Sequence, residues 1–403
     1  MSYFHLNFIL KGKLTVCCLL MLSVMPLNAQ REAKQIGDFK ESISLNEHLR
    51  GTKRTLQYRP DGDEFVCVNG KNRYTRALYG SHSPFRVETS DRPVFAFYNN
   101  GRGGNISFKV ILRDGTELAL DCTGHCESRY SAGKRTYYLT DPSWGKGELR
   151  ISVLALADMD GAIWRFSPSN MPKGAILRWQ HGGATGKRLS RNGDMGVDPA
   201  DCFELPVEAT DLVTGELPLQ KEVYLVRGEV PEDYNVRKLY QQAEAASLAL
   251  ASHLKIETPD PYLNTLGGAL VAAADGIWDG QVWLHGAIGW RMPLSGWRAG
   301  YTGDALGWHD RARTHFDAYA ASQVTDVPNT IPHPAQDSTM NLARSEKRWG
   351  TPQYSNGYIC RNPRRNNQMH HYDMNLCYMD ELLWHFNWTG DTAYVRKMWP
   401  VIT

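Results

Sequence analysis

The chain has 403 residues, of which 42% are hydrophobic and 11% aromatic, so its composition excludes a disordered protein. Its 45 basic and 43 acidic residues leave a formal net charge of +2, which gives no electrostatic basis for binding nucleic acid or an anionic membrane. A chain of this length favours two or three domains.

Residues 1–29 predict a signal peptide. Lys11 and Lys13 precede the apolar run TVCCLLMLSVMPL, and Ala29 supplies a small residue for cleavage. The run is too short to cross a bilayer, so we expect no membrane span. Export with cleavage is the favoured interpretation, and a retained lipid or membrane anchor is the alternative.

The cysteines after residue 29 are too few for a disulfide scaffold. They are Cys67, Cys122, Cys126, Cys202, Cys360 and Cys377. Cys122 and Cys126 frame a short loop and could pair in an oxidising compartment. With His125 they could also suggest zinc, but the second half of a four-ligand site is missing. Buried or locally paired thiols are therefore favoured.

Residues 36–232 predict an antiparallel β-sandwich domain. Short runs rich in β-branched and aromatic residues alternate there with DG and NG turn signals. The clearest case is FKVILRDGTELAL, which predicts two strands around an Asp114-Gly115 turn. No helical pattern separates the strands, which is typical of a sandwich.

The hydrophobic period changes to that of a helix near residue 233. Asp233 could cap a linker helix within 233–257, and residues 258–403 read as helices separated by loops. The apolar stripes are Leu263, Leu266, Leu270 and Ala274; Trp308, Ala312, Phe316 and Tyr319; and Met374, Cys377, Tyr378 and Leu382. The sequence stops on the uncapped apolar run YVRKMWPVIT, so we expect it to be a fragment of a longer protein.

Two motifs in the helical part resemble those of the six-hairpin glycosidases, in which a β-sandwich precedes an (α/α)6 barrel. GYTGDA (300–305) is similar to the GWTGDA element of α-L-rhamnosidase-type barrels. DELLWHFNWTGDTAYVRKMWPVI (380–402) resembles the helix–TGD–helix hairpin that recurs around such barrels. Taken whole, the sequence is similar to exported glycosidases of gut Bacteroidetes that act on plant polysaccharides such as pectin, β-L-arabinofuranosidases among them.

This resemblance implies a multidomain β-then-α fold: an N-terminal β-sandwich, a linker helix and the first part of an (α/α)6 barrel. It implies an exported glycoside hydrolase, in the periplasm or on the surface of a Gram-negative bacterium, acting on plant cell-wall carbohydrate by general acid–base chemistry without a cofactor or metal. The rhamnosidase-type pattern has its catalytic glutamate seven residues before the aspartate of the GD pair, where this sequence has Trp297, so that role is not carried over. Asp304 matches a substrate-binding or assisting carboxylate. The second catalytic carboxylate is expected outside this partial barrel.

Residues 296–319 crowd aromatic rings, guanidinium groups and carboxylates into one turn and the start of one helix. Glycosidic hydrolysis requires two carboxyl groups, and aromatic rings stack on sugars while polar side chains hold their hydroxyls. The candidate catalytic residues are Asp304, Asp310 and Glu381, and this stretch adds Trp297, Arg298, Tyr301 and Trp308 as candidate substrate-binding residues. The alternatives are a helix cap for Asp304, a solvated ion pair for Asp310, and core packing for the tryptophans. For Glu381 the alternative is exposure on its helix or an ion pair with a neighbouring base. His309 and His315 are interpreted as structural.

A long connection, residues 325–372, forms the second candidate region, because loops of this length are usually functional or disordered. Its end, RNPRRNNQMHHYD, adds Arg364, Arg365, His370, His371 and Asp373 as candidate substrate-binding residues. Asp373 could also cap the helix that follows. The Arg/Asn/His/Tyr cluster of 364–372 leaves a polysaccharide lyase open, and a non-catalytic carbohydrate-binding protein is the third possibility. A metal at His370, His371 and Asp373 is disfavoured because no i,i+4 pair places two ligands on one helical face.

Overall fold

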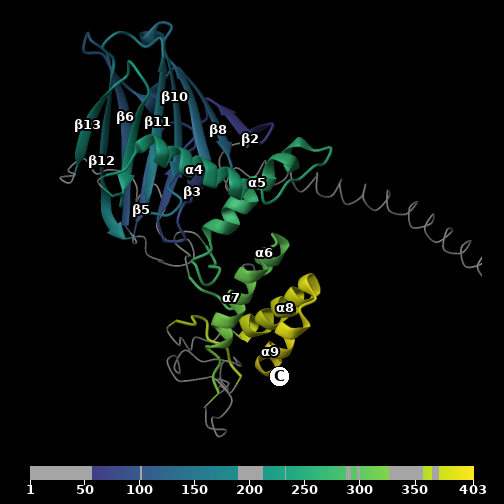
Figure 1. Ribbon diagram of the computed structural model, residues 1–403. Helices are drawn as coiled ribbons and strands as arrows, with labels where there is room; N and C mark the ends of the chain where they lie inside the picture. Colours follow the sequence, from purple (N-terminus) through teal and green to yellow (C-terminus); the bar gives the residue numbers. More distant parts are fainter. Residues whose placement is uncertain are drawn as a thin grey trace, which may run out of the picture. The chain divides into compact units, whose positions relative to one another are not determined.

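The structure is a computed structural model that describes residues 57–99, 102–188, 212–231, 233–286, 292–296, 300–325, 357–364 and 372–403. All of these except Gln57 belong to one compact unit, Tyr58–Thr403. Antiparallel β-sheets come first in this unit and helices follow (Figure 1). None of the described helices is long and apolar enough to cross a bilayer.

The strands form two antiparallel sheets. The first has the order β1-β2-β8-β9-β10-β11-β14, with bounds Arg59–Asp61, Glu64–Val68, His125–Ser131, Lys134–Thr140, Glu148–Ala155, Gly161–Ser169 and Val223–Gly228. The second has the order β13-β12-β6-β5-β4-β3, with bounds Val213–Pro218, Ile176–Arg188, Arg102–Ile111, Phe95–Asn99, Arg86–Thr89 and Arg76–Leu78. β7 (Glu117–Ala119) pairs with β6, and short 3-10 helices follow at Leu120–Cys122 and Pro142–Trp144.

The predicted Asp114-Gly115 hairpin is confirmed between β6 and β7. Ile111 pairs with Glu117, and the amide of Thr116 donates to the Asp114 carboxylate at 2.9 Å. Gly115 has a φ of 88°, a conformation that side chains with a Cβ rarely adopt. The turn residues therefore determine this register.

One apolar core joins the two sheets, as a sandwich requires. Side chains of β11 alternate, so Trp164 and Phe166 enter this core while Ile163 points to the opposite face. Phe95 of the second sheet meets Tyr137 and Trp164 of the first edge-on, with ring centroids 5.6 Å apart in both pairs. Edge-on pairs of this kind stabilise by about 0.5–1.5 kcal/mol beyond the area that they bury.

Helix α4 (Val236–Ala251) covers part of the outer face of the first sheet. Leu239 and Tyr240 pack with Ile163 in a second apolar cluster. The cap of α4 is Asn235, whose side chain accepts from the amide of Lys238, so the prediction that Asp233 caps it is wrong. The cap is the residue immediately before the first helical turn, where its oxygen can reach the unpaired amides.

Helix α5 (Pro261–Gly276) buries Ala274 of the predicted stripe but not its leucines. Leu263 and Leu270 are 46% and 51% exposed, whereas the buried face consists largely of small residues. A Cβ on Gly267 would lie 2.6 Å from the Leu254 carbonyl oxygen, so this face packs too closely for leucine. Close backbone packing therefore overrides the apolar periodicity.

Four further helices are described: α6 (Gly300–Ala305), α7 (His309–Ala320), α8 (Tyr372–Thr389) and α9 (Thr392–Ile402). The predicted stripes of α7 and α8 are confirmed at Phe316, Tyr319, Tyr378 and Leu382, each fully buried in a common cluster. Gly390, with a φ of 63°, separates α8 from α9, which gives the expected helix–TGD–helix hairpin.

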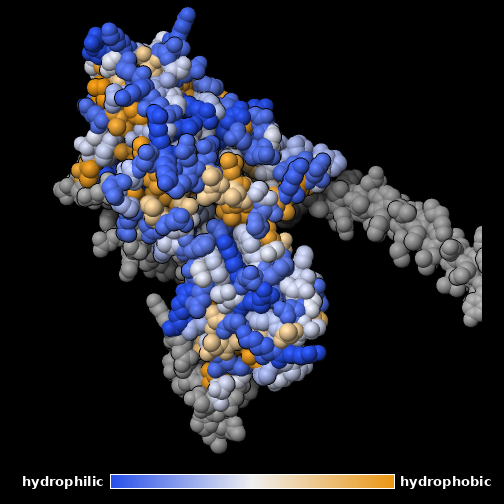
Figure 2. Space-filling view, viewed as in Figure 1, coloured by the Kyte–Doolittle hydropathy of each residue, from blue (hydrophilic) through white to orange (hydrophobic). Residues whose placement is uncertain are grey.

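Hydrophilic residues cover most of the face seen in Figure 2, with hydrophobic residues in small groups.

The thiols of Cys122 and Cys126 are free, and Cys126 is fully buried. Burial raises the pKa of the Cys126 thiol to about 12.

Candidate functional site

The short helix α6 carries Asp304 into the interior. Gly303 lies against the ring of Trp283, where a Cβ would overlap the ring, so a glycine is required there. α6 ends at Ala305, and the amide of Trp308 then bonds to the carbonyl of Gly303. Asp304 is 5% exposed in this arrangement. Its side chain does not cap α7, since Trp308 occupies the cap position and makes no side-chain cap bond.

The α6–α8 seam, defined here by Gly300, Asp304, Glu381 and His385, joins two helical faces. Glu381 and His385 are four residues apart, so they share one face of α8, and they are 1% and 0% exposed. A Cβ on Gly300 would overlap the Glu381 carboxylate. One turn along α6, both oxygens of Asp304 lie 2.9 Å from Nδ1 of His385. The seam is therefore a buried polar interface with two contacts one helical turn apart.

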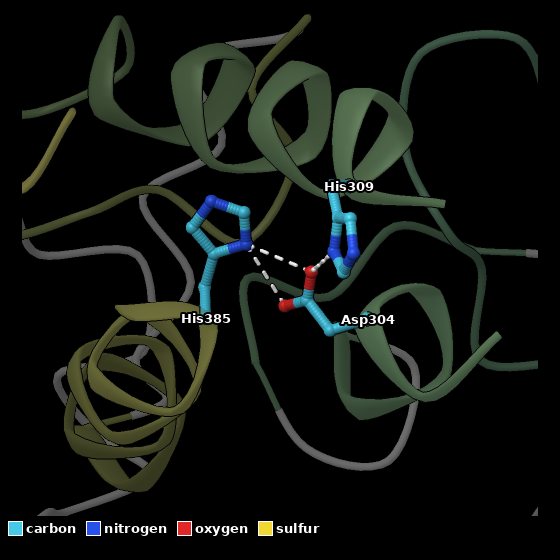
Figure 3. Close-up of side chains that lie close together, drawn as sticks. All are labelled: Asp304, His309 and His385. Carbon is cyan, nitrogen blue, oxygen red and sulfur yellow. Dashed lines mark hydrogen bonds and ion pairs between the residues drawn. The ribbon is translucent and has the colours of Figure 1, made fainter. Parts of the chain in front are cut away.

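His309, the first residue of α7, completes a three-residue cluster (Figure 3). Its Nδ1 lies 2.7 Å from Oδ1 of Asp304, and its side chain is 38% exposed. Each Nδ1 can donate to the carboxylate, so Asp304 has a hydrogen-bond partner on each of two helices, which offsets the cost of burying it.

Asp304, His309 and His385 are also the described residues whose ligand atoms lie close enough to hold a metal, all within 4.8 Å of one another. Ligands of a tetrahedral zinc with bonds of about 2.0 Å would be about 3.3 Å apart, which is longer than the 2.7 and 2.9 Å separations here. Nε2 of His385 is buried and has no hydrogen-bond partner in the described structure, whereas a metal-bound histidine usually donates from its second nitrogen. The geometry fits direct hydrogen bonds better than a metal centre.

Two of the predicted aromatic residues are described: Tyr301 lies within α6, and Trp308 follows it. Tyr301 is 42% exposed, and its hydroxyl donates to Asp380 at 2.8 Å. That hydrogen bond is the main reason that the pKa of Tyr301 is raised to about 12, so the phenol stays protonated. The ring of Trp308 lies 4.3 Å below the guanidinium of Arg311 and packs against the helical core.

Asp310 does not join the seam. Its side chain is 94% exposed and forms an ion pair with Arg313. The solvated i,i+3 pair is therefore the structural role of Asp310, and we withdraw it as a catalytic candidate. The reason is its position on α7, where it lies outside the buried stripe of Ala312, Phe316 and Tyr319.

Arg364 is bound to other side chains. Its guanidinium contacts both carboxylate oxygens of Asp279 at 2.8 and 2.9 Å, and its Nε donates to Gln281. This ion pair fixes Arg364 against the segment after α5, which weakens its prediction as a substrate-binding residue.

Asp373 lies inside α8 and not before it, so the prediction that it caps this helix is wrong. The side chain of Asp373 is outside the described residues. Trp297, Arg298, Arg365, His370 and His371 also lie outside the described residues.

Sequence reasoning missed the two histidines. His309 was interpreted as structural, and His385 was not singled out. The available signal was the spacing of Glu381 and His385, since an acid and a histidine four residues apart share one helical face. Their burial and the approach of Asp304, 81 residues away, could not be read from that spacing.

Comparisons with known proteins give limited matches. A family model described as "Domain of unknown function (DUF4450)" matches residues 100–229, and no curated protein matches the chain. Among solved structures, a bacterial glucoamylase complexed with acarbose is similar at 8% identity and a TM-score of 0.41. That match covers 64% of this chain and 55% of the glucoamylase, so the chain spans little more than half of that protein. The similarity is too low to assign a function, and the seam lies outside the residues that the family model matches.

Proposed function

We propose that this protein is a glycoside hydrolase in which Glu381 and Asp304 form the carboxylate pair. The observation that carries the proposal is the α6–α8 seam. It places two buried carboxylates, Glu381 against Gly300 and Asp304 against His385, at contacts four residues apart on each helix. Glycosidases act with a pair of carboxyl groups across the scissile bond.

The surroundings of the two acids suit different roles. Asp304 lies within hydrogen-bond distance of two histidine rings that can orient its carboxylate, and we assign it the role of base or nucleophile. Glu381 then serves as the acid that protonates the leaving oxygen. His309 is the exposed edge of the cluster, and we place the approach of substrate on that side.

The substrate class that we propose is plant cell-wall carbohydrate of the pectin type, cleaved outside the cytoplasm by an exported protein. Support comes from the GYTGDA and TGD motifs, which resemble those of six-hairpin barrels, and from helices α6 to α9, which would then be the first part of such a barrel. No cofactor is needed for this chemistry.

The test is hydrolysis of a panel of pectic and arabinan oligosaccharides, followed by release of reducing ends. We expect Glu381→Gln and Asp304→Asn each to lower kcat by at least about 100-fold, as for loss of a general acid or base. Asp310→Asn is the matched control and should keep full activity. Hydrolysis that persists in both seam variants would remove the seam from catalysis. An ultraviolet-absorbing unsaturated product would indicate a lyase instead, and binding without turnover would indicate a carbohydrate-binding protein.

A further inference from the structure

A cavity of about 210 Å³ lies where the connection after β3 meets α4, α5 and α7. Small residues surround most of it, which is why space remains: Gly80, Gly133, Ala155, Ala157, Ala243, Ala246 and Ala272. The residues of its wall with polar side chains are Tyr79, His82, Ser247, Asp275 and Arg311. The seam residues Asp304, Glu381 and His385 are not part of this wall, so the cavity is distinct from the proposed catalytic site.

The charged groups of the cavity are held in fixed positions. Oδ1 of Asp275 accepts from Arg311 at 2.7 Å and lies 3.2 Å from Nε2 of His82. Burial raises the pKa of Asp275, but the hydrogen bonds and charges of His82 and Arg311 outweigh it and leave that pKa below its usual value. Asp275 is therefore an anion whose charge is matched by its neighbours.

Arg311 is oriented by aromatic rings. Its guanidinium lies 4.3 Å from the centroid of Trp308 and 5.7 Å from that of Trp278. Ser247 is also fixed, because its hydroxyl donates to the carbonyl of Ala132 at 2.6 Å. Donors and acceptors that are already positioned lose little conformational freedom when a ligand binds.

We propose that this cavity binds a neutral monosaccharide or a polyol of similar size. Because Arg311 already matches the charge of Asp275, the wall favours a neutral ligand over an ion. Asp275 can accept from hydroxyl groups, Arg311 and His82 can donate to them, and the alanine and glycine surfaces can contact C–H groups. The volume is below the roughly 300–1,000 Å³ of pockets for drug-sized ligands, which selects a single sugar ring. This inference goes beyond the proposed hydrolase activity and does not depend on it.

Titration calorimetry with L-arabinose, D-galactose, L-rhamnose and the charged D-galacturonate tests the proposal. We expect at least one neutral sugar to bind more tightly than galacturonate. Asp275→Asn should weaken that binding at least tenfold, and Ala272→Leu should abolish it by filling the cavity. Glu257→Gln, an exposed control, and Asp304→Asn should bind as the parent does. Thermal unfolding reports whether each variant is folded, and Asp275→Asn decides the outcome if Ala272→Leu does not fold.

Three results would overturn the proposal. The first is that none of the neutral sugars binds. The second is that binding survives unchanged in folded Asp275→Asn. The third is that binding is lost in Asp304→Asn but kept in Asp275→Asn, which would place the ligand at the seam. Oligosaccharide hydrolysis is measured separately, so failure of the hydrolase proposal leaves this test unaffected.

Discussion

The sandwich and the helical part pair their buried acids with different partners. The sandwich core is one continuous apolar cluster in which Phe95, Phe97, Phe108 and Trp164 contact one another edge-on or tilted. The helical part has a smaller apolar cluster and buries Asp304, Glu381 and His385 beside it. The sandwich also buries charged residues, but there Asp91 and Glu88 face the guanidinium groups of Arg135 and Arg86, whereas in the helical part Asp304 faces histidine rings. Buried polar groups cost stability unless they are paired, so each region depends on its own set of pairs.

The largest effect on stability should come from the centre of the sandwich. Trp164 is fully buried against three other rings, so Trp164→Ala should lower the free energy of unfolding by about 3–5 kcal/mol. Guanidinium unfolding followed by circular dichroism measures this. Trp399→Ala, at a residue that is 53% exposed, is the control and should change it by less than about 0.5 kcal/mol. Equal effects would mean that the sandwich core is not the main source of stability.

A buried acid in the sandwich provides a pH test of the same contrast. Burial raises the pKa of Glu88 to about 7 against the opposing charge of Arg86, whereas the unfolded chain titrates near 4.5. Between these two values the folded state holds a proton that the unfolded state has lost, so stability falls as pH rises. The loss is complete above about pH 7 and reaches about 3 kcal/mol.

Glu88→Gln removes this titration and should flatten the fall in stability between about pH 5 and about pH 8. Urea unfolding at the two pH values gives the difference directly. Glu257→Gln, whose parent side chain is 86% exposed, should leave the slope as it is. A slope that persists in Glu88→Gln would assign it to another group.

The two histidines of the seam should differ in their effect on stability. His385→Ala leaves the buried carboxylate of Asp304 with one donor fewer, so we expect a loss of about 1–3 kcal/mol. His309→Ala should cost less, since water can replace a side chain that is 38% exposed. A double-mutant cycle with Asp304→Asn should give a coupling of at least about 0.5 kcal/mol for His385. No coupling would contradict the hydrogen-bonded cluster.

The smallest effect is expected at Asp310. Its ion pair with Arg313 is exposed to solvent, and pairs of this kind contribute at most about 1 kcal/mol. Asp310→Asn should therefore leave both the unfolding midpoint and the rate of hydrolysis near those of the parent. A large loss of activity would return Asp310 to the list of catalytic candidates and weaken the assignment to the seam.

The sequence by itself determined the elements whose burial follows a local period. Alternation along the strands, the Asp114-Gly115 turn and the stripes of α7 and α8 were predicted correctly, because each depends on residues within a few positions of one another. The same reasoning failed for α5. There a close approach to Leu254 selects glycine and alanine for the buried face and leaves Leu263 and Leu270 in solvent.

Only the tertiary structure decided which polar residues meet. Glu381 and Asp304 were both predicted as candidates. Asp310, also predicted, lies in solvent, whereas His385, which was not predicted, is buried beside Asp304. His385 lies 81 residues from Asp304, and the absence of a side chain at Gly300 and Gly303 allows α6 to approach α8 and Trp283. Contacts across that distance depend on how the helices dock, and no local pattern in the sequence encodes the docking.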